Sequence, residues 1–150
     1  MTLQKKGIYT EPWVIMFQPA LLRLANARKL SGSDFRVFFM LLSKTEMKNW
    51  IKVQQSALAR EMGLTRATVC RAFKNLCELG VIEPKRLEGT KIVDYRLSLS
   101  VGWRGTVHDY YAERAKSRKE GGDPTSQDPE GQMVEHADIY SDPDNGSQLH

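Results

Sequence analysis

Arginine, lysine and threonine side chains gather on one face of a predicted helix over residues 66–79, and these groups suit nucleic acid. At 100° per residue, the face opposite the apolar stripe carries Ala67, Arg71 and Lys74. An arginine can donate two hydrogen bonds to guanine O6 and N7, while lysine and threonine suit phosphate oxygens. The alternative is the solvated face of a small helical bundle. The candidate DNA contacts on this helix are Thr65, Arg66, Ala67, Thr68, Arg71, Lys74 and Asn75.

Two helices and a tight turn would position that face, and residues 55–80 carry the pattern for them. In the first helix, apolar residues recur at three- and four-residue spacing. Gly63 can adopt the left-handed conformation that ends a helix, and Thr65 can cap the next one. This pattern is typical of a helix-turn-helix, whose second helix enters a DNA major groove. The second helix has the apolar stripe Val69, Ala72, Phe73, Leu76 and Leu79, and Gly80 supplies its stop.

After the second helix the period changes from 3.6 to 2, which predicts a β-hairpin across residues 81–97. Pro84 argues for an edge strand, and the returning strand alternates one buried face with one wet face. A helix-turn-helix followed by such a hairpin is a winged helix, so we expect a mainly α fold with a small β-hairpin wing (α+β). The wing carries Lys85, Arg86 and Lys91, which we expect at phosphates or in a minor groove. A charged edge that only prevents aggregation is the alternative.

Charge is divided unevenly along the 150 residues. All 22 Lys and Arg lie in residues 1–119 with 10 acidic residues, a formal charge of +12, while residues 120–150 carry −8. A basic body favours a polyanionic partner, here double-stranded DNA. We expect a flexible basic arm over 1–12, a winged-helix DNA-binding domain over 13–106, a basic helix over 107–119 and an acidic disordered tail over 120–150. The tail is expected to compete with DNA for the body.

The helix expected ahead of the motif is unusually apolar. Ser33 is predicted to cap it, and residues 35–42 leave little more than Arg36 for water. A helix with so little polar surface needs cover, either from the predicted 19–29 helix or from a second subunit. Both alternatives stay open, and a homodimer is the expected partner state.

Several functional classes are disfavoured by the sequence. The pair Tyr110–Tyr111 beside His108 suggests a nicking enzyme, but the histidines are scattered and no phosphate-binding loop is present, so we expect no enzyme, cofactor or metal site. Cys70 and Cys77 lie about 10 Å apart along one helix, too far for a disulfide. No apolar run is long enough to span a bilayer. We therefore expect a cytoplasmic protein with no membrane partner.

The run SALAREMGLTRATVCRAFKNLCELGVIEP, followed by YRLSLSVGWRGT, resembles the RepL-type plasmid replication proteins and their winged-helix relatives. The resemblance covers about residues 30–106, and its more particular feature is Tyr95-Arg96-Leu97 followed by Trp103-Arg104-Gly105. It implies sequence-specific DNA binding in plasmid replication initiation or control at an origin. Repressors of the MarR and Crp kinds are similar over the same helices. A transcriptional regulator and a partition or adaptor protein are therefore the alternatives.

Overall fold

The computed structural model describes residues 12–120, and the chain divides into two compact units, residues 1–110 and 111–150. The sequence-based boundary between residues 106 and 107 stays a prediction. The expected basic arm and acidic tail lie outside the described residues, apart from Pro12 and Glu120. Among the helices of residues 12–120, none is long and apolar enough to cross a membrane.

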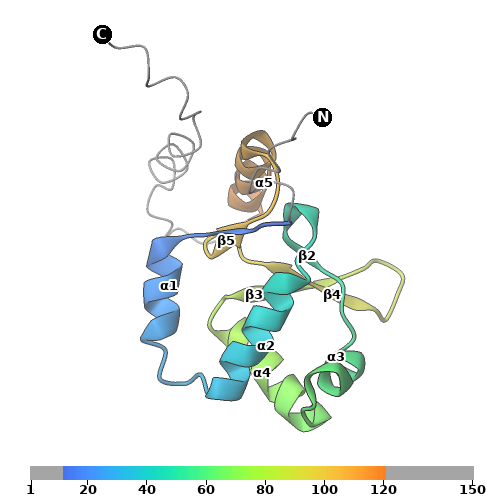
Figure 1. The fold of residues 1–150 in the computed structure, drawn as a ribbon. Coiled ribbons are helices and arrows are strands. Elements are labelled where there is room, and N and C mark those ends of the chain that lie inside the picture. Colours follow the sequence, from blue (N-terminus) through green and yellow to red (C-terminus); the bar gives the residue numbers. More distant parts are fainter. Residues whose placement is uncertain (1–11, 121–150) are drawn as a thin grey trace, which may run out of the picture. The chain divides into compact units, whose positions relative to one another are not determined.

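The described chain is built from short helices and short strands (Figure 1). The helices are α1 (Gln18–Ala25), α2 (Gly32–Ser43), the 3₁₀ turn η2 (Met47–Asn49), α3 (Gln55–Met62), α4 (Arg66–Glu78) and α5 (Val107–Lys119). The strands are β1 (Ile15–Met16), β2 (Trp50–Ile51), β3 (Ile82–Arg86), β4 (Val93–Leu97) and β5 (Gly102–Trp103).

The strands form two small antiparallel sheets, one pairing β1 with β5 and the other in the order β2-β4-β3. In the second sheet Ile51 lies opposite Tyr95, and Ile82 lies opposite Leu97. The chain therefore leaves this sheet after β2, forms α3 and α4, and returns to it at β3. Pro84 lies in β3 at the edge, as its missing N–H group predicted. The loop joining β3 to β4 projects beyond the helices (Figure 1).

The helix-turn-helix is confirmed by both of its turn signals. Gly63 has φ 65°, a left-handed conformation that ends α3, and Thr65 accepts a hydrogen bond from the Thr68 amide at 3.1 Å. The predicted stripe of α4 is buried against α2, apart from Leu79, which is partly exposed. The fold is an α+β winged helix.

One expectation about α2 was wrong. The cap is Ser31 rather than Ser33: its Oγ accepts from the Asp34 amide, and its own amide donates to Asp34 at 2.9 Å. This reciprocal capping box starts the helix two residues earlier than predicted. The Phe39 side chain of this helix is 65% exposed, so residues 12–120 of one chain do not cover it fully, and cover by a second subunit stays an open alternative.

The wet face of the returning strand was predicted only in part. Ser98 is buried, and Arg96 is half-buried because its guanidinium lies 5.5 Å from the centre of the Trp50 ring. Its Nε also donates to the carbonyl of Lys48 at 2.9 Å. These contacts come from η2 and β2, which lie 48 and 46 residues earlier in the chain. The alternation of polar and apolar residues within one strand cannot predict contacts with such distant segments.

A buried asparagine holds the turn before β2. Asn49 is 0% exposed and has φ 68°, and its Nδ2 donates to the carbonyls of Leu97 at 3.0 Å and Gly102 at 2.8 Å. Its Oδ1 accepts from the Arg104 amide at 2.8 Å. Arg104 in turn donates its guanidinium to the carbonyl of Thr45. The Asn49 side chain therefore ties η2 to the end of β4 and to the segment that follows it.

Candidate nucleic-acid interface

Cationic side chains project to solvent from the N-terminal two-thirds of α4. Arg66, Arg71 and Lys74 are all exposed, and Ala67 between them adds no bulk. Neither arginine forms an ion pair or side-chain hydrogen bond with any residue in 12–120. Lys74 Nζ lies 4.0 Å from Glu78 Oε1, an exposed pair of the kind that contributes little. Both guanidinium groups therefore keep all their donors available to an external partner.

The two threonines at the start of α4 form hydrogen bonds within the protein. Thr65 is exposed and caps the helix, and its hydroxyl lies 2.7 Å from that of Thr68, which is half-buried. Helix N-termini present free amides to anions, so this end of α4 suits a phosphate as well as the threonine hydroxyls do.

Asn75 is positioned differently from the other predicted contacts. Its side chain is half-buried, and its Nδ2 donates to Asp34 Oδ2 at 3.1 Å. The amide therefore holds α4 against α2. This bond gives Asn75 a partner on the protein side that the other predicted contacts lack, and its place in the DNA-contacting set stays a prediction.

The wing presents two cations without a protein partner. Arg86 and Lys91 are exposed on either side of the turn at Gly89, which has φ 74°, and neither is paired within residues 12–120. Lys85 is half-buried and forms an exposed ion pair with Glu83 at 3.2 Å. The structure therefore brings Arg86 and Lys91 together at the projecting loop and leaves Lys85 partly neutralised.

A junction that the sequence did not reveal joins α3, α4 and β4. Gln55 Nε2 donates to the Tyr95 hydroxyl at 3.1 Å, and Cys70 donates to Gln55 Oε1 at 2.9 Å. The Tyr95 ring meets Phe73 edge-on with centroids 4.8 Å apart. Burial raises the pKa of the Tyr95 hydroxyl, and the Gln55 hydrogen bond opposes that shift. The wing is thereby fastened to the helix that carries the exposed arginines.

Of the two tyrosines considered for chemistry other than binding, Tyr110 is occupied by packing. Tyr110 is buried, and its ring contacts Phe17 and Trp103 edge-on at 5.8 and 5.5 Å. Cys70 and Cys77 are both free, and burial raises the pKa of the Cys77 thiol. In the part of the chain that the structure describes, no group of three His, Cys, Asp or Glu side chains could hold a metal ion.

A family model described as the Crp-like helix-turn-helix domain matches residues 20–97, more than half of the chain. The chain belongs to the Crp-like helix-turn-helix domain family. It is thus a DNA-binding winged-helix protein, and the matched range contains the exposed cations of both α4 and the wing. The resemblance to RepL-type proteins is supported only at this coarser level. Its distinguishing residues Trp103 and Arg104 lie outside the match, where Trp103 is buried and Arg104 bonds to η2 and Thr45.

Two solved structures are similar to this chain. A possible transcriptional regulator from Methanosarcina mazei Go1 shares 15% identity, with a TM-score of 0.36, over 88% of this chain and 100% of its own. A zinc-responsive MarR family member from Lactococcus lactis, ZitR, shares 13% identity, with a TM-score of 0.35, over 81% of this chain and 89% of its own. Comparison with curated proteins gave no match.

Proposed function

We propose that this Crp-like helix-turn-helix protein binds double-stranded DNA sequence-specifically and regulates transcription, without enzymatic activity, in the cytoplasm. One observation carries the proposal: Arg66 and Arg71 project from one face of α4 with no partner in residues 12–120. Lys44 on the same unit, by contrast, is paired with Glu61 at 3.0 Å. Unpaired guanidinium groups on a helix that is capped and held by its neighbours suit bidentate bonds to guanine.

In the proposed complex, α4 lies in the major groove as the recognition helix. Arg71 reads a base edge, while Arg66 and Lys74 lie between base edges and phosphates. Ala67 permits close approach of the backbone. Thr65 and Thr68, at the N-terminus of α4, face a phosphate. On the wing, Arg86 and Lys91 bind the DNA backbone or the adjacent minor groove, and Lys85 contributes less because of Glu83.

Plasmid replication initiation or control by origin binding is the second candidate. The resemblance over residues 30–106 favours it, but that resemblance rests on a helix-turn-helix that many regulators share. Base readout by α4 is the same in both roles. The position of the bound sequence in the genome, over a promoter or at an origin, distinguishes the two.

We also propose that the protein binds as a homodimer. Phe39 on α2 and Leu22 on α1 are exposed by 65% and 66%, so two large apolar side chains are available for contact with a second copy. A two-fold dimer reads a palindrome with half-sites about 10 base pairs apart. Sedimentation velocity of the full chain with and without DNA tests this part of the proposal.

Selection from a library of randomised duplexes tests the main proposal. We expect enrichment of one site, and a titration of that site should show log affinity falling with log salt at a slope of about −5, as for about six neutralised phosphates. A library that enriches no sequence, with binding that is still salt-dependent, would limit the protein to non-specific DNA association. Absence of DNA binding at low salt would overturn the proposal.

A further inference from the structure

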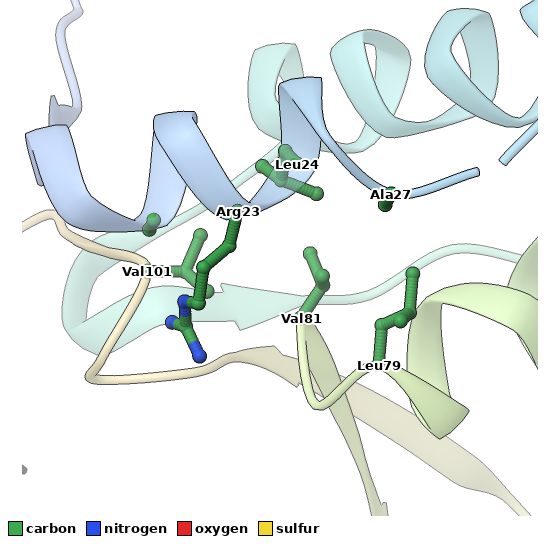
Figure 2. A pocket seen from close by; sticks show the side chains of 7 residues that line it. Arg23, Leu24, Ala27, Leu79, Val81 and Val101 are labelled. Carbon is green, nitrogen blue, oxygen red and sulfur yellow. The ribbon is translucent and has the colours of Figure 1, made fainter. Parts of the chain in front are cut away.

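A slot lies between α1 and the connection that leads from α4 into β3 (Figure 2). Its volume is about 260 Å³. In Figure 2, Leu24 and Ala27 point from the α1 side toward Val81 and Leu79, and Arg23 reaches toward Val101 at one end. Exposure of Leu79 and Arg23 shows that the slot reaches the surface. The lining residues are Ala20, Arg23, Leu24, Ala27, Leu79, Val81 and Val101.

The slot combines apolar walls with a single charge. Six of its seven lining side chains are aliphatic, and Arg23 is the exception. The Arg23 guanidinium forms no ion pair or side-chain hydrogen bond with any residue in 12–120. Arg23 also lies in the last turn of α1, where a cation favours the helix dipole. In Figure 2 the Arg23 guanidinium lies over the slot. The favourable interaction with the helix dipole does not require that position.

Backbone hydrogen bonds fix the walls of the slot. The Val81 amide donates to the Leu76 carbonyl at 2.9 Å, and the Val101 carbonyl accepts from the Phe17 amide at 3.0 Å. On the opposite wall, Ala20 and Ala27 present only methyl groups. The space therefore persists because small side chains face a wall that is held in place. Ligand pockets have this preformed character, with apolar lining and few polar groups that fix orientation.

We propose that this slot binds a small organic acid, with its carboxylate on Arg23 and its apolar body between α1 and Val81. Arginine matches a carboxylate with two parallel hydrogen bonds. The volume lies just below the usual range of about 300–1,000 Å³ for ligand pockets, so the ligand is a short-chain or single-ring acid. Leu79 and Val81 flank Gly80, where α4 ends, so a bound acid contacts both α1 and the end of the recognition helix. This site is separate from the proposed DNA contacts.

Calorimetry on the full chain without DNA tests the proposal. The probes are benzoate, hexanoate and octanoate, each compared with its neutral primary amide. We expect saturable binding of at least one acid. Arg23→Gln should weaken that acid about tenfold and leave the matching amide unchanged, because a charge-assisted bond is removed and the apolar walls remain. Arg28→Gln, at an exposed arginine that does not line the slot, is the matched control.

Filling the slot provides a second test. Ala27→Leu should abolish binding of both acid and amide, and Leu79→Phe, at a partly exposed position, replaces it if Ala27→Leu fails to fold. Saturable heat from none of the six probes with the wild-type protein would overturn the proposal. Equal affinity of the acid for wild type and Arg23→Gln would also overturn it. Neither result bears on DNA binding, which is measured separately on the selected duplex.

Discussion

The Asn75 side chain donates a hydrogen bond of 3.1 Å to Asp34 Oδ2 and so joins the recognition helix α4 to the start of α2. Asp34 is 3% exposed, and the same oxygen accepts from the Ser31 amide at 2.9 Å. One carboxylate therefore caps α2 and holds α4. The exposed face of α4 is oriented by this shared acceptor together with the apolar contact between the two helices.

Removing that bond should destabilise the fold. Asn75→Ala is expected to lower the free energy of unfolding by about 1–2 kcal/mol, because a buried carboxylate loses a partner. Asn75→Asp should cost more, since it places a second carboxylate beside Asp34. Urea denaturation measures both. Asn26→Ala is the control, because Asn26 is exposed and its Nδ2 donates only to the Leu22 carbonyl. Equal losses at the two asparagines would show that Asp34 does not need Asn75.

Arg71→Ala should change what the protein reads without changing how stable it is. We expect a loss of about 1–3 kcal/mol in binding the selected duplex and relaxed preference at one base pair, with the unfolding curve unchanged because Arg71 has no partner in residues 12–120. Repeating the duplex selection with the variant measures the preference. Arg28→Ala, an exposed arginine after α1, should keep it. An Arg71→Ala protein with the wild-type preference would remove Arg71 from the readout.

Lys91→Ala should act on affinity alone. Loss of one phosphate contact should weaken binding to all duplexes similarly and make the salt slope shallower by about 0.9. Fluorescence anisotropy across a salt series measures the slope. Lys52→Ala is the matched control, since Lys52 is exposed and its Nζ lies 3.5 Å from Glu46 Oε2. A loss confined to particular sequences would instead indicate that the wing reads bases.

Two substitutions of Asn49 can separate the stability contributed by its side-chain hydrogen bonds from the cost of its left-handed backbone conformation. Asn49→Gly keeps a residue that accepts φ 68° but loses three hydrogen bonds, so we expect a loss of roughly 3 kcal/mol of stability. Asn49→Ala should lose about 1–2 kcal/mol more, because alanine disfavours the left-handed conformation. Thermal and urea unfolding measure the pair. If alanine proved no worse than glycine, the left-handed backbone would not be strained.

Tyr95 should make stability fall in alkali. Burial raises the pKa of its hydroxyl above the ordinary 10.0, so the unfolded chain ionises first. This contribution to stability is fully present below pH 10 and is lost as pH rises through the folded pKa. Tyr95→Phe keeps the ring on Phe73 and removes the ionisation, so its unfolding free energy should decline less steeply above pH 10. Parallel wild-type and variant curves across that range would contradict the assignment.

Local signals predicted the reading motif well. Gly63, Thr65 and the apolar stripe of α4 act over three or four residues, and so does the hairpin with Pro84 at its edge. Each of these features depends on the residue spacing within one helix, strand or turn, so it can be read from a short stretch of sequence. The structure confirms the winged helix that they imply, while the DNA contacts themselves stay predictions.

Long-range hydrogen bonds explain what the sequence did not reveal. Asn75 was assigned to DNA because its helical position is near the exposed face, but its partner Asp34 is 41 residues away. Asn49 was not singled out, although it bonds across 48 to 55 residues. Ser33 was predicted as the cap of α2, and the reciprocal bond between Ser31 and Asp34 places the cap at Ser31 instead. Phe39 is exposed because no described element covers that side of α2.

The segment that carries α3 and α4 is anchored at both ends in one sheet, at β2 and at β3. The inward side chains of α4 pack in the core and keep the segment in place. Its outward side chains at 66, 67 and 71 make no packing contribution to the fold of residues 12–120. Under the proposed function, specificity and folding therefore depend on side chains on opposite sides of a single helix. Substituting the outward residues 66, 67 and 71 alone could therefore change the target sequence while the fold stays the same.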